Sequence, residues 1–163
     1  MPRKVVSKKS RIPDFFINAK FFTDKLYATV GCHPTRCNEF DEFAEGPEGY
    51  IEALKDLILT NKDKIVAIGE CGLDYDRLNF CKVEVQKKYL ESQLDLCEAI
   101  GHDLPLFLHC RAAAQDLIEI LKRRGADGSD KLASKGVIHS FDGTLEEAKA
   151  FIDLGYDIGL NGW

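Results

Sequence analysis

The sequence lacks a long apolar run. Nowhere in its 163 residues do apolar side chains follow one another for the roughly 18 positions that a membrane-spanning helix requires. The basic residues between Arg3 and Arg11 are also not followed by the continuous apolar segment of a secretory signal. We therefore expect an intracellular protein, in the nucleus or the cytoplasm, without a membrane partner.

Positive charge is scarce as well. The chain has 22 Lys and Arg residues against 27 Asp and Glu residues, a formal net charge of -5, and residues 1–11 are basic and contain no acid. The remainder of the chain is therefore distinctly acidic. Because binding of nucleic acid through a broad surface needs an excess of positive charge, this composition argues against that mode and leaves any phosphate contact to a local site.

The six cysteines are not expected to form disulfides, because the reducing interior of a cell keeps thiols reduced. A zinc site of cysteine and histidine is the alternative. In the pairs Cys32-His33 and His109-Cys110 the two neighbours point to opposite faces of a strand, so both cannot easily bind one ion. Cys32 and Cys37 can still meet across a turn, although their spacing is wider than in common zinc knuckles.

One stretch, Ile65–Asp74, organises the rest of the chain. It opens with the apolar, mostly β-branched run IVAIG, which leads directly to Glu70 and then to a Gly-Leu-Asp sequence. Such a run is typical of a buried strand in a parallel sheet. We expect this strand to present Glu70 at its C-terminal end and to be followed by a turn.

Three other apolar runs end at a group that can bind a metal. The groups are His33, His109 and His139, after the runs 26–31, 104–108 and 136–138. The number of residues between successive groups, Glu70 included, is close to the length of one strand–helix unit in a barrel of eight units and roughly 250 residues. Enzymes with this barrel place their active sites at the carboxyl ends of the strands. A lone histidine there is more often a satisfied interior residue. A glutamate and two histidines at matched strand ends predict a divalent-metal site.

Amphipathic helices are expected between the strands, at 48–59, 82–100 and 112–124, and a capping box at Thr144 and Glu147 starts a fourth that runs to residue 154. A last strand is expected at 156–160. This alternation predicts a right-handed parallel α/β fold, a partial TIM (β/α) barrel. Because five strands are too few for eight-stranded closure, the first and last should be open edges that favour association, with the oligomeric state left open.

Four of these stretches resemble successive signatures of the TatD-type deoxyribonucleases. They are GCHP at 31–34, AIGECGLDY at 67–75, PLFLHCR at 105–111 and HSFDGT at 139–144. The resemblance runs from about residue 26 to residue 163. The form GCHPTRC at 31–37 is similar to the eukaryotic branch of the family.

This resemblance implies a metal-dependent nuclease on a TIM barrel of the amidohydrolase-like superfamily. Glu70 matches the carboxylate that bridges two metal ions in the family, and His109 and His139 match ligands of one of them. The implied cofactors are divalent metal ions, with Mg indicated by the family and Mn or Zn compatible with mixed imidazole and carboxylate ligands. The implied substrate is DNA, as single strands or as ends.

His33 and Arg111 are the candidates for catalytic contact with the substrate. Arg111 follows His109 by two positions and can pair bidentately with a phosphate, although a salt bridge at the barrel rim is an equal alternative. Asp74 is expected to be the partner of a ligand, or a turn residue, rather than a ligand itself.

The chain also departs from the family pattern. The family opens with a strand carrying a His-x-His motif and closes with a strand bearing Glu-Thr-Asp-x-Pro, and this chain has neither motif. We expect 1–25 to be an atypical basic, partly disordered segment and 26–163 to be a barrel fragment, truncated at both ends, with impaired activity. Two other functions stay open: a metal hydrolase of the same superfamily that acts on small amides or esters, and a truncated product without catalysis.

Overall fold

A five-stranded parallel β-sheet forms the centre of the molecule in a computed structural model, which describes residues 26–101, 104–125 and 136–162. Its strands are β1 (Ala28–Val30), β2 (Ile65–Asp74), β3 (Leu106–Arg111), β4 (Gly136–His139) and β5 (Asp157–Ile158). They lie in the order β1-β2-β3-β4-β5, each parallel to the next. The expected N-terminal segment 1–25 lies outside the described residues.

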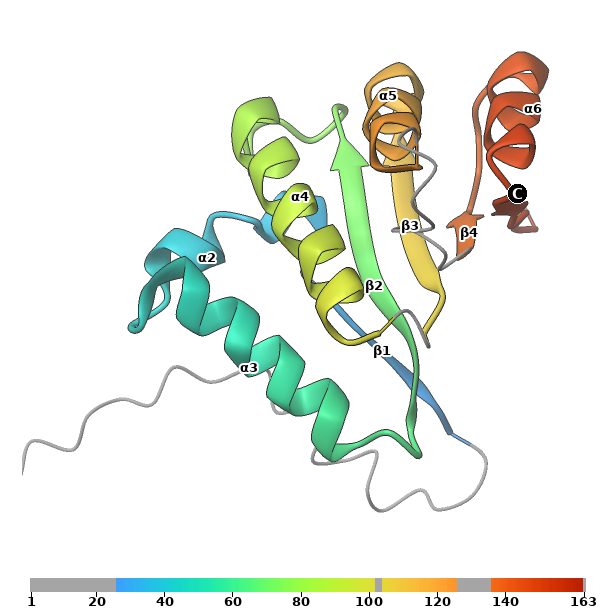
Figure 1. Cartoon of the computed structure of the whole chain (residues 1–163). Coiled ribbons are helices and arrows are strands. Elements are labelled where there is room, and N and C mark those ends of the chain that lie inside the picture. The colour runs from blue at the N-terminus through green and yellow to red at the C-terminus, as the bar shows by residue number, and fades with distance from the viewer. Residues whose placement is uncertain (1–25, 102–103, 126–135, 163) are drawn as a thin grey trace, which may run out of the picture.

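Helices alternate with the strands, and α4 packs against β2 while α5 packs against β3 (Figure 1). The helical elements are η1 (Pro34–Arg36), α2 (Glu39–Glu42), α3 (Gly46–Thr60), α4 (Val83–Ala99), α5 (Ala114–Gly125) and α6 (Leu145–Asp153). The alternation confirms the predicted parallel α/β arrangement. The short elements η1 and α2 were not predicted.

The core lies between the sheet and its helices. Alternate strand residues such as Leu108 and Ile138 are fully buried and share one apolar cluster with Leu94 and Leu117 of the helices. Each fully buried leucine or isoleucine contributes about 1.5–3 kcal/mol to stability. Because side chains alternate along a strand, the neighbouring His109 projects from the other face of the sheet.

Local sequence signals account for the helix ends. At α6 the backbone N–H of Glu147 donates to Thr144 Oγ1 (3.2 Å), and the backbone N–H of Thr144 donates to Glu147 Oε2 (2.7 Å), which confirms the predicted capping box. At the end of α5, Arg124 forms ion pairs with Glu91, Asp95 and Glu98 of α4. Arg124 therefore links the end of α5 to α4.

Strand β2 is longer than predicted. Glu70 was expected at its C-terminal end, but the strand continues to Asp74, with an irregularity in its pairing to β3 between Gly69 and Cys71. Gly72 explains why the Gly-Leu-Asp sequence is no turn. Its φ is 143°, and a Cβ there would lie 2.0 Å from the carbonyl oxygen of His109. The glycine allows a close approach of two strands, and the prediction of a turn was wrong.

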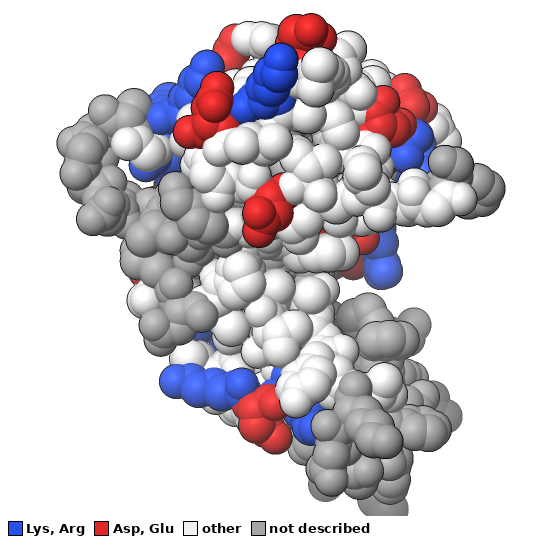
Figure 2. Space-filling model, turned by 90° about the vertical axis from the view of Figure 1, so that its right-hand side faces the viewer, with Lys and Arg blue, Asp and Glu red and all other residues white. Residues whose placement is uncertain are grey.

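Strands β1 and β5 are the edges of the described sheet, so the sheet is open as expected. Apolar side chains are exposed near both edges, with Tyr27 60% exposed and Leu160 80% exposed. Figure 2 shows the right-hand side of the view in Figure 1, where Lys and Arg side chains are interspersed with Asp and Glu and form no continuous basic patch among the described residues. The predicted association through the edges stays a prediction.

All six cysteines are buried and free, as predicted. Burial raises the pKa of the Cys71 and Cys110 thiols to about 12, so both are protonated at neutral pH. The groups of described side chains that are arranged to hold a metal contain no cysteine, which does not favour the alternative zinc site. None of the helices in the described ranges has the length and apolar character needed to cross a bilayer.

Candidate metal centre

Glu70 lies at the centre of a cluster on the face of the sheet opposite to the described helices. Its Oε1 atom is 2.8 Å from His109 Nδ1, 2.5 Å from His139 Nε2 and 3.5 Å from His33 Nε2. Three histidine side chains, from β3, β4 and the loop after β1, therefore meet around one oxygen atom of Glu70. The structure thus brings together the residues that the sequence placed after successive apolar runs.

The register of the strands explains this convergence. His109 of β3 pairs directly with His139 of β4, so their side chains emerge next to each other on one face. Phe107 lies two residues before His109 on the same face, and its ring stacks on the His139 imidazole with centroids 4.5 Å apart and planes at 14°. The sequence analysis did not single out Phe107, although strand periodicity alone places it beside the site.

Glu70 is an anion in this surrounding. Burial raises the pKa of Glu70, but the hydrogen bonds with His109 and His139 outweigh it and bring the pKa down to about 2. The side chain is still 30% exposed, so water reaches the centre. A carboxylate that stays ionised and remains accessible is a suitable ligand for a divalent cation.

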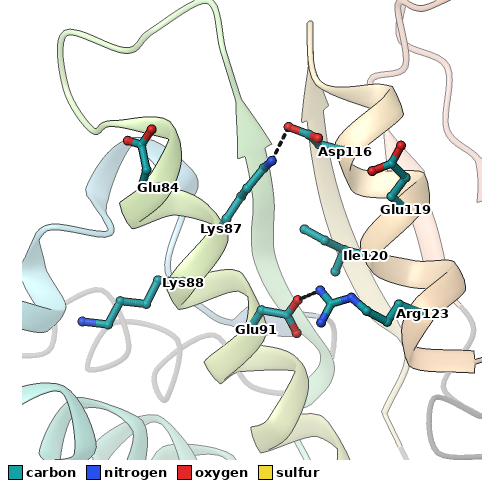
Figure 3. Close-up of a pocket in the computed structure, with 8 residues that line it drawn as sticks. All are labelled: Glu84, Lys87, Lys88, Glu91, Asp116, Glu119, Ile120 and Arg123. Carbon is teal, nitrogen blue, oxygen red and sulfur yellow. Dashed lines mark hydrogen bonds and ion pairs between the residues drawn. The ribbon is translucent and has the colours of Figure 1, made fainter.

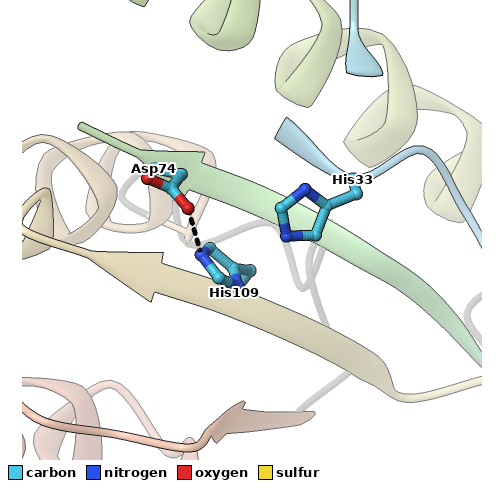
Figure 4. Close-up of side chains that lie close together, drawn as sticks. All are labelled: His33, Asp74 and His109. Carbon is cyan, nitrogen blue, oxygen red and sulfur yellow. Dashed lines mark hydrogen bonds and ion pairs between the residues drawn. The ribbon is translucent and has the colours of Figure 1, made fainter. Parts of the chain in front are cut away.

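Asp74 stands behind His109, as Figure 4 shows. Its fully buried carboxylate accepts a hydrogen bond from His109 Nε2 through Oδ2 (3.0 Å), and its Oδ1 accepts backbone N–H bonds from Asp76 and Arg77. The other ring nitrogen, Nδ1, faces the second carboxylate, Glu70 Oε1, at 2.8 Å. With a cation at Glu70, the proton would stay on Nε2 beside Asp74, and Nδ1 would offer its lone pair to the cation.

Two sets of described residues have metal-site geometry, and both include His109. One is Glu70, His109 and His139; the other is His33, Asp74 and His109. In the second set, a metal between Asp74 and His109 would have to displace the proton that joins them. The first set offers a carboxylate oxygen and two imidazole nitrogens within 4.8 Å of one another and fits a divalent cation. In that set Asp74 would hold the position behind a ligand, and this role stays a prediction.

Gln86 holds Asp74 from the helix side. Its side-chain oxygen accepts the Asp74 N–H, and its side-chain amide donates to the Asp74 carbonyl, both at 2.8 Å. Gln86 is fully buried on α4. A glutamine inside an apolar helix stripe was the signal in the sequence for this support, and the sequence analysis missed it.

His33 reaches the cluster from the loop after β1. Burial, together with the neighbouring His109, lowers the pKa of His33 below its usual value. The rings of His33 and His109 meet edge to face, with centroids 4.5 Å apart. This shift favours the neutral imidazole of His33.

Arg111 lies at the end of β3 and forms a salt bridge with Asp142, with Nη1 2.8 Å from Oδ2. Its Nε atom is buried and has no hydrogen-bond partner within the described part of the chain. Both residues line a cavity of about 210 Å³ that also includes Phe141 and Glu147. The rim salt bridge left open by the sequence is thus present, and contact of Arg111 with a substrate stays a prediction.

A larger hollow of about 630 Å³ lies on the outer side of the molecule, between α4 and α5 (Figure 3). Its charged side chains are paired with one another. Lys87 Nζ lies 2.6 Å from Asp116 Oδ2, and Arg123 pairs with Glu91. None of the residues around Glu70 lines this hollow.

Comparisons with known proteins indicate the family of this chain. The family model described as TatD related DNase matches residues 7–163. Deoxyribonuclease Tat-D of Schizosaccharomyces pombe is 43% identical over 83% of this chain and 42% of its own length. The 3'-5' ssDNA/RNA exonuclease TatD of a Rahnella species is 35% identical over 86% of this chain and 47% of its own length.

The fold is also similar to that of a solved structure. The crystal structure of a hydrolase TatD family protein from Entamoeba histolytica superposes with a TM-score of 0.73 at 40% identity, over 90% of this chain and 46% of that protein. The chain therefore spans about half the length of the relatives that it matches. Both its sequence and its structure show that it belongs to the family of TatD-related DNases.

Proposed function

We propose that this chain carries the metal-binding part of a nuclease that hydrolyses phosphodiester bonds in DNA, with single strands or strand ends as substrates. The observation that carries the proposal is the position of three metal-compatible donors around Glu70, with Asp74 fixing His109 from behind. The names of the similar proteins, a deoxyribonuclease and an exonuclease of single-stranded DNA and RNA, support the substrate class.

In this proposal Glu70, His109 and His139 hold a divalent cation. The bound cation would supply an activated water and charge stabilisation for the phosphodiester oxygens. Mg is the cation that the family resemblance indicates, while the mixed nitrogen and oxygen donors also suit Mn or Zn.

The chain's other residues act on the substrate side. His33 Nε2 faces the same oxygen of Glu70 as the two ligands and lies where a phosphate oxygen would approach. Arg111 is anchored by Asp142 at the rim and can turn its guanidinium to a second phosphate oxygen. Asp74 contacts the imidazole of His109 and Phe107 stacks on that of His139, so both side chains would keep the imidazoles in place.

The proposal is tested by incubating purified residues 1–163 with labelled single-stranded DNA in the presence of Mg or Mn. Cleavage should require the added metal and should be abolished by Glu70→Gln, which keeps the size of the side chain but removes its charge. Glu52→Gln is the matched control, because Glu52 is exposed on α3, where it pairs with Lys55 at the surface. Equal cleavage by wild type and Glu70→Gln would contradict the proposal.

A panel of small amide and ester substrates, assayed beside the DNA, distinguishes the proposed nuclease activity from the alternative hydrolysis of small amides or esters. Metal-dependent turnover of those compounds without cleavage of DNA would replace the proposed substrate class while keeping the metal site.

A further inference from the structure

His33 occupies the first position of a small structural unit. Pro34 follows it and begins η1, so His33 is the N-cap of that helical turn. Its Nδ1 atom lies 3.2 Å from the backbone nitrogen of Thr35, which donates to it, and 2.7 Å from Thr35 Oγ1. An imidazole nitrogen thus takes the place of the side-chain oxygen that usually caps a helix.

This contact decides which nitrogen of His33 carries the proton. A backbone N–H can only donate a hydrogen bond, so Nδ1 must present its lone pair to Thr35. A neutral imidazole has a single N–H, which is therefore on Nε2. The Thr35 hydroxyl, which lies 2.7 Å from the same nitrogen, can rotate to donate to it as well.

Nε2 of His33 points into the metal centre. It lies 3.5 Å from the carboxylate oxygen Oε1 of Glu70. His109 has the opposite orientation: its Nε2 points away to Asp74, and its Nδ1 faces Glu70. Two histidines in edge-to-face contact thus present different ring nitrogens to one centre, Nε2 from His33 and Nδ1 from His109.

We infer that Thr35 holds His33 in the Nε2–H form, so that His33 donates a hydrogen bond to a phosphate oxygen of the substrate and is neither a metal ligand nor a general base. This inference deepens the proposed function and rests on it for the identity of the acceptor. Thr35 is then a positioning residue. In chemical terms, the subsite formed by His33 takes a phosphate oxygen anion next to the bound cation, where a neutral donor needs no proton transfer.

The tautomer can be read directly from the metal-free protein. Long-range 1H–15N NMR spectra of residues 1–163, labelled with 15N at histidine and recorded at pH 7.5, should show His33 with its proton on Nε2. The signals of His33 are assigned by their loss in His33→Gln. Thr35→Val removes the hydroxyl but keeps the backbone amide, and the Nε2–H form should persist. A proton on Nδ1 in the wild type would overturn the inference.

Mn²⁺ binding separates a donor from a ligand. His33→Leu and His33→Gln should bind Mn²⁺ within about twofold of the wild type, whereas His139→Leu should bind at least about 10-fold more weakly, because inner ligands matter more than outer partners. If His33→Leu lost as much affinity as His139→Leu, His33 would be a ligand and the inference would be wrong.

Binding of inorganic phosphate to the Mn²⁺-loaded chain tests the donor role itself. Glutamine can place an N–H close to the position of Nε2, so His33→Gln should retain phosphate affinity within about threefold, while His33→Leu should lose about 10-fold, the scale of one hydrogen bond to a charged group. Equal losses in both variants would overturn the donor role. If the wild type bound no Mn²⁺, the proposed function would fail together with the phosphate acceptor, and the metal-free spectra would still decide the tautomer.

Discussion

Two charged regions of this molecule differ in what they offer to a ligand. In the hollow between α4 and α5, Lys87 pairs with Asp116 and Arg123 with Glu91, so opposite charges satisfy one another at the surface. Around Glu70, two imidazoles and a carboxylate converge, with their ligand atoms within 4.8 Å of one another. The larger hollow is thus a surface of paired charges between helices, and the smaller cluster directs three potential metal ligands at one point.

The size of a hollow and the number of its charges therefore do not identify a ligand-binding site. Ion pairs at the surface are screened and contribute little to stability, with a median of about 0–1 kcal/mol. Side chains that direct their lone pairs at one point repel one another, so such a group is unfavourable unless a cation or protons lie between them. Single substitutions in each region test whether the two regions differ in this way.

The largest effect is expected from removing the central charge. Glu70→Gln should weaken Mn²⁺ binding by more than about 100-fold, because the anionic inner ligand is lost. Glu91→Gln in the outer hollow should leave Mn²⁺ affinity unchanged, although it removes the carboxylate that pairs with Arg123 and Arg124. Isothermal titration with MnCl₂ measures both. Equal losses would show that the two regions do not differ in the way described.

A smaller effect is expected one step away from the metal. Asp74→Asn should weaken Mn²⁺ binding by about 10- to 100-fold, because an amide no longer fixes the proton of His109 on Nε2. Asp76→Asn is the neighbouring control, since Asp76 touches Asp74 only through its backbone N–H. Unchanged Mn²⁺ affinity in Asp74→Asn would remove Asp74 from the set of positioning residues.

The pH dependence of stability should also distinguish the regions. Folding lowers the pKa of Glu70 from 4.5 to about 2, so its contribution is complete above pH 4.5 and is lost as the pH falls toward 2. After allowance for partial exposure, this amounts to about 1–3 kcal/mol. Urea unfolding with a chelator at pH 6 and pH 3 should therefore show a larger loss of stability for the wild type than for Glu70→Gln. Parallel losses would contradict the assignment.

The smallest effect is expected in the outer hollow. Lys87→Met removes the ion pair with Asp116 while keeping the aliphatic stem, and it should change the free energy of unfolding by less than about 1 kcal/mol without altering Mn²⁺ binding. Thermal unfolding and the Mn²⁺ titration provide the two readings. A larger loss of stability, or any loss of metal affinity, would mean that this surface is coupled to the site.

Several elements followed directly from short-range patterns in the sequence. The apolar run after residue 64 and the capping box at Thr144 predicted β2 and the start of α6, because strand burial and helix capping depend on nearby residues. The spacing of His109 and His139 predicted neighbouring strands, since each strand–helix unit has a nearly constant length. The sequence by itself therefore determined the parallel α/β arrangement and the residues that meet at its centre.

The tertiary structure decided what each of these residues faces. Whether Gly72 starts a turn or lets two strands approach depends on His109, which is distant in the sequence. The proton on His109 depends on Asp74, and the lone pair of His33 on the loop that begins at Pro34. Periodicity can place a side chain on a face, but hydrogen-bond partners are set by register and by loop geometry. For that reason the residues of the cluster could be named from the sequence, whereas the partner of each ring nitrogen required the fold.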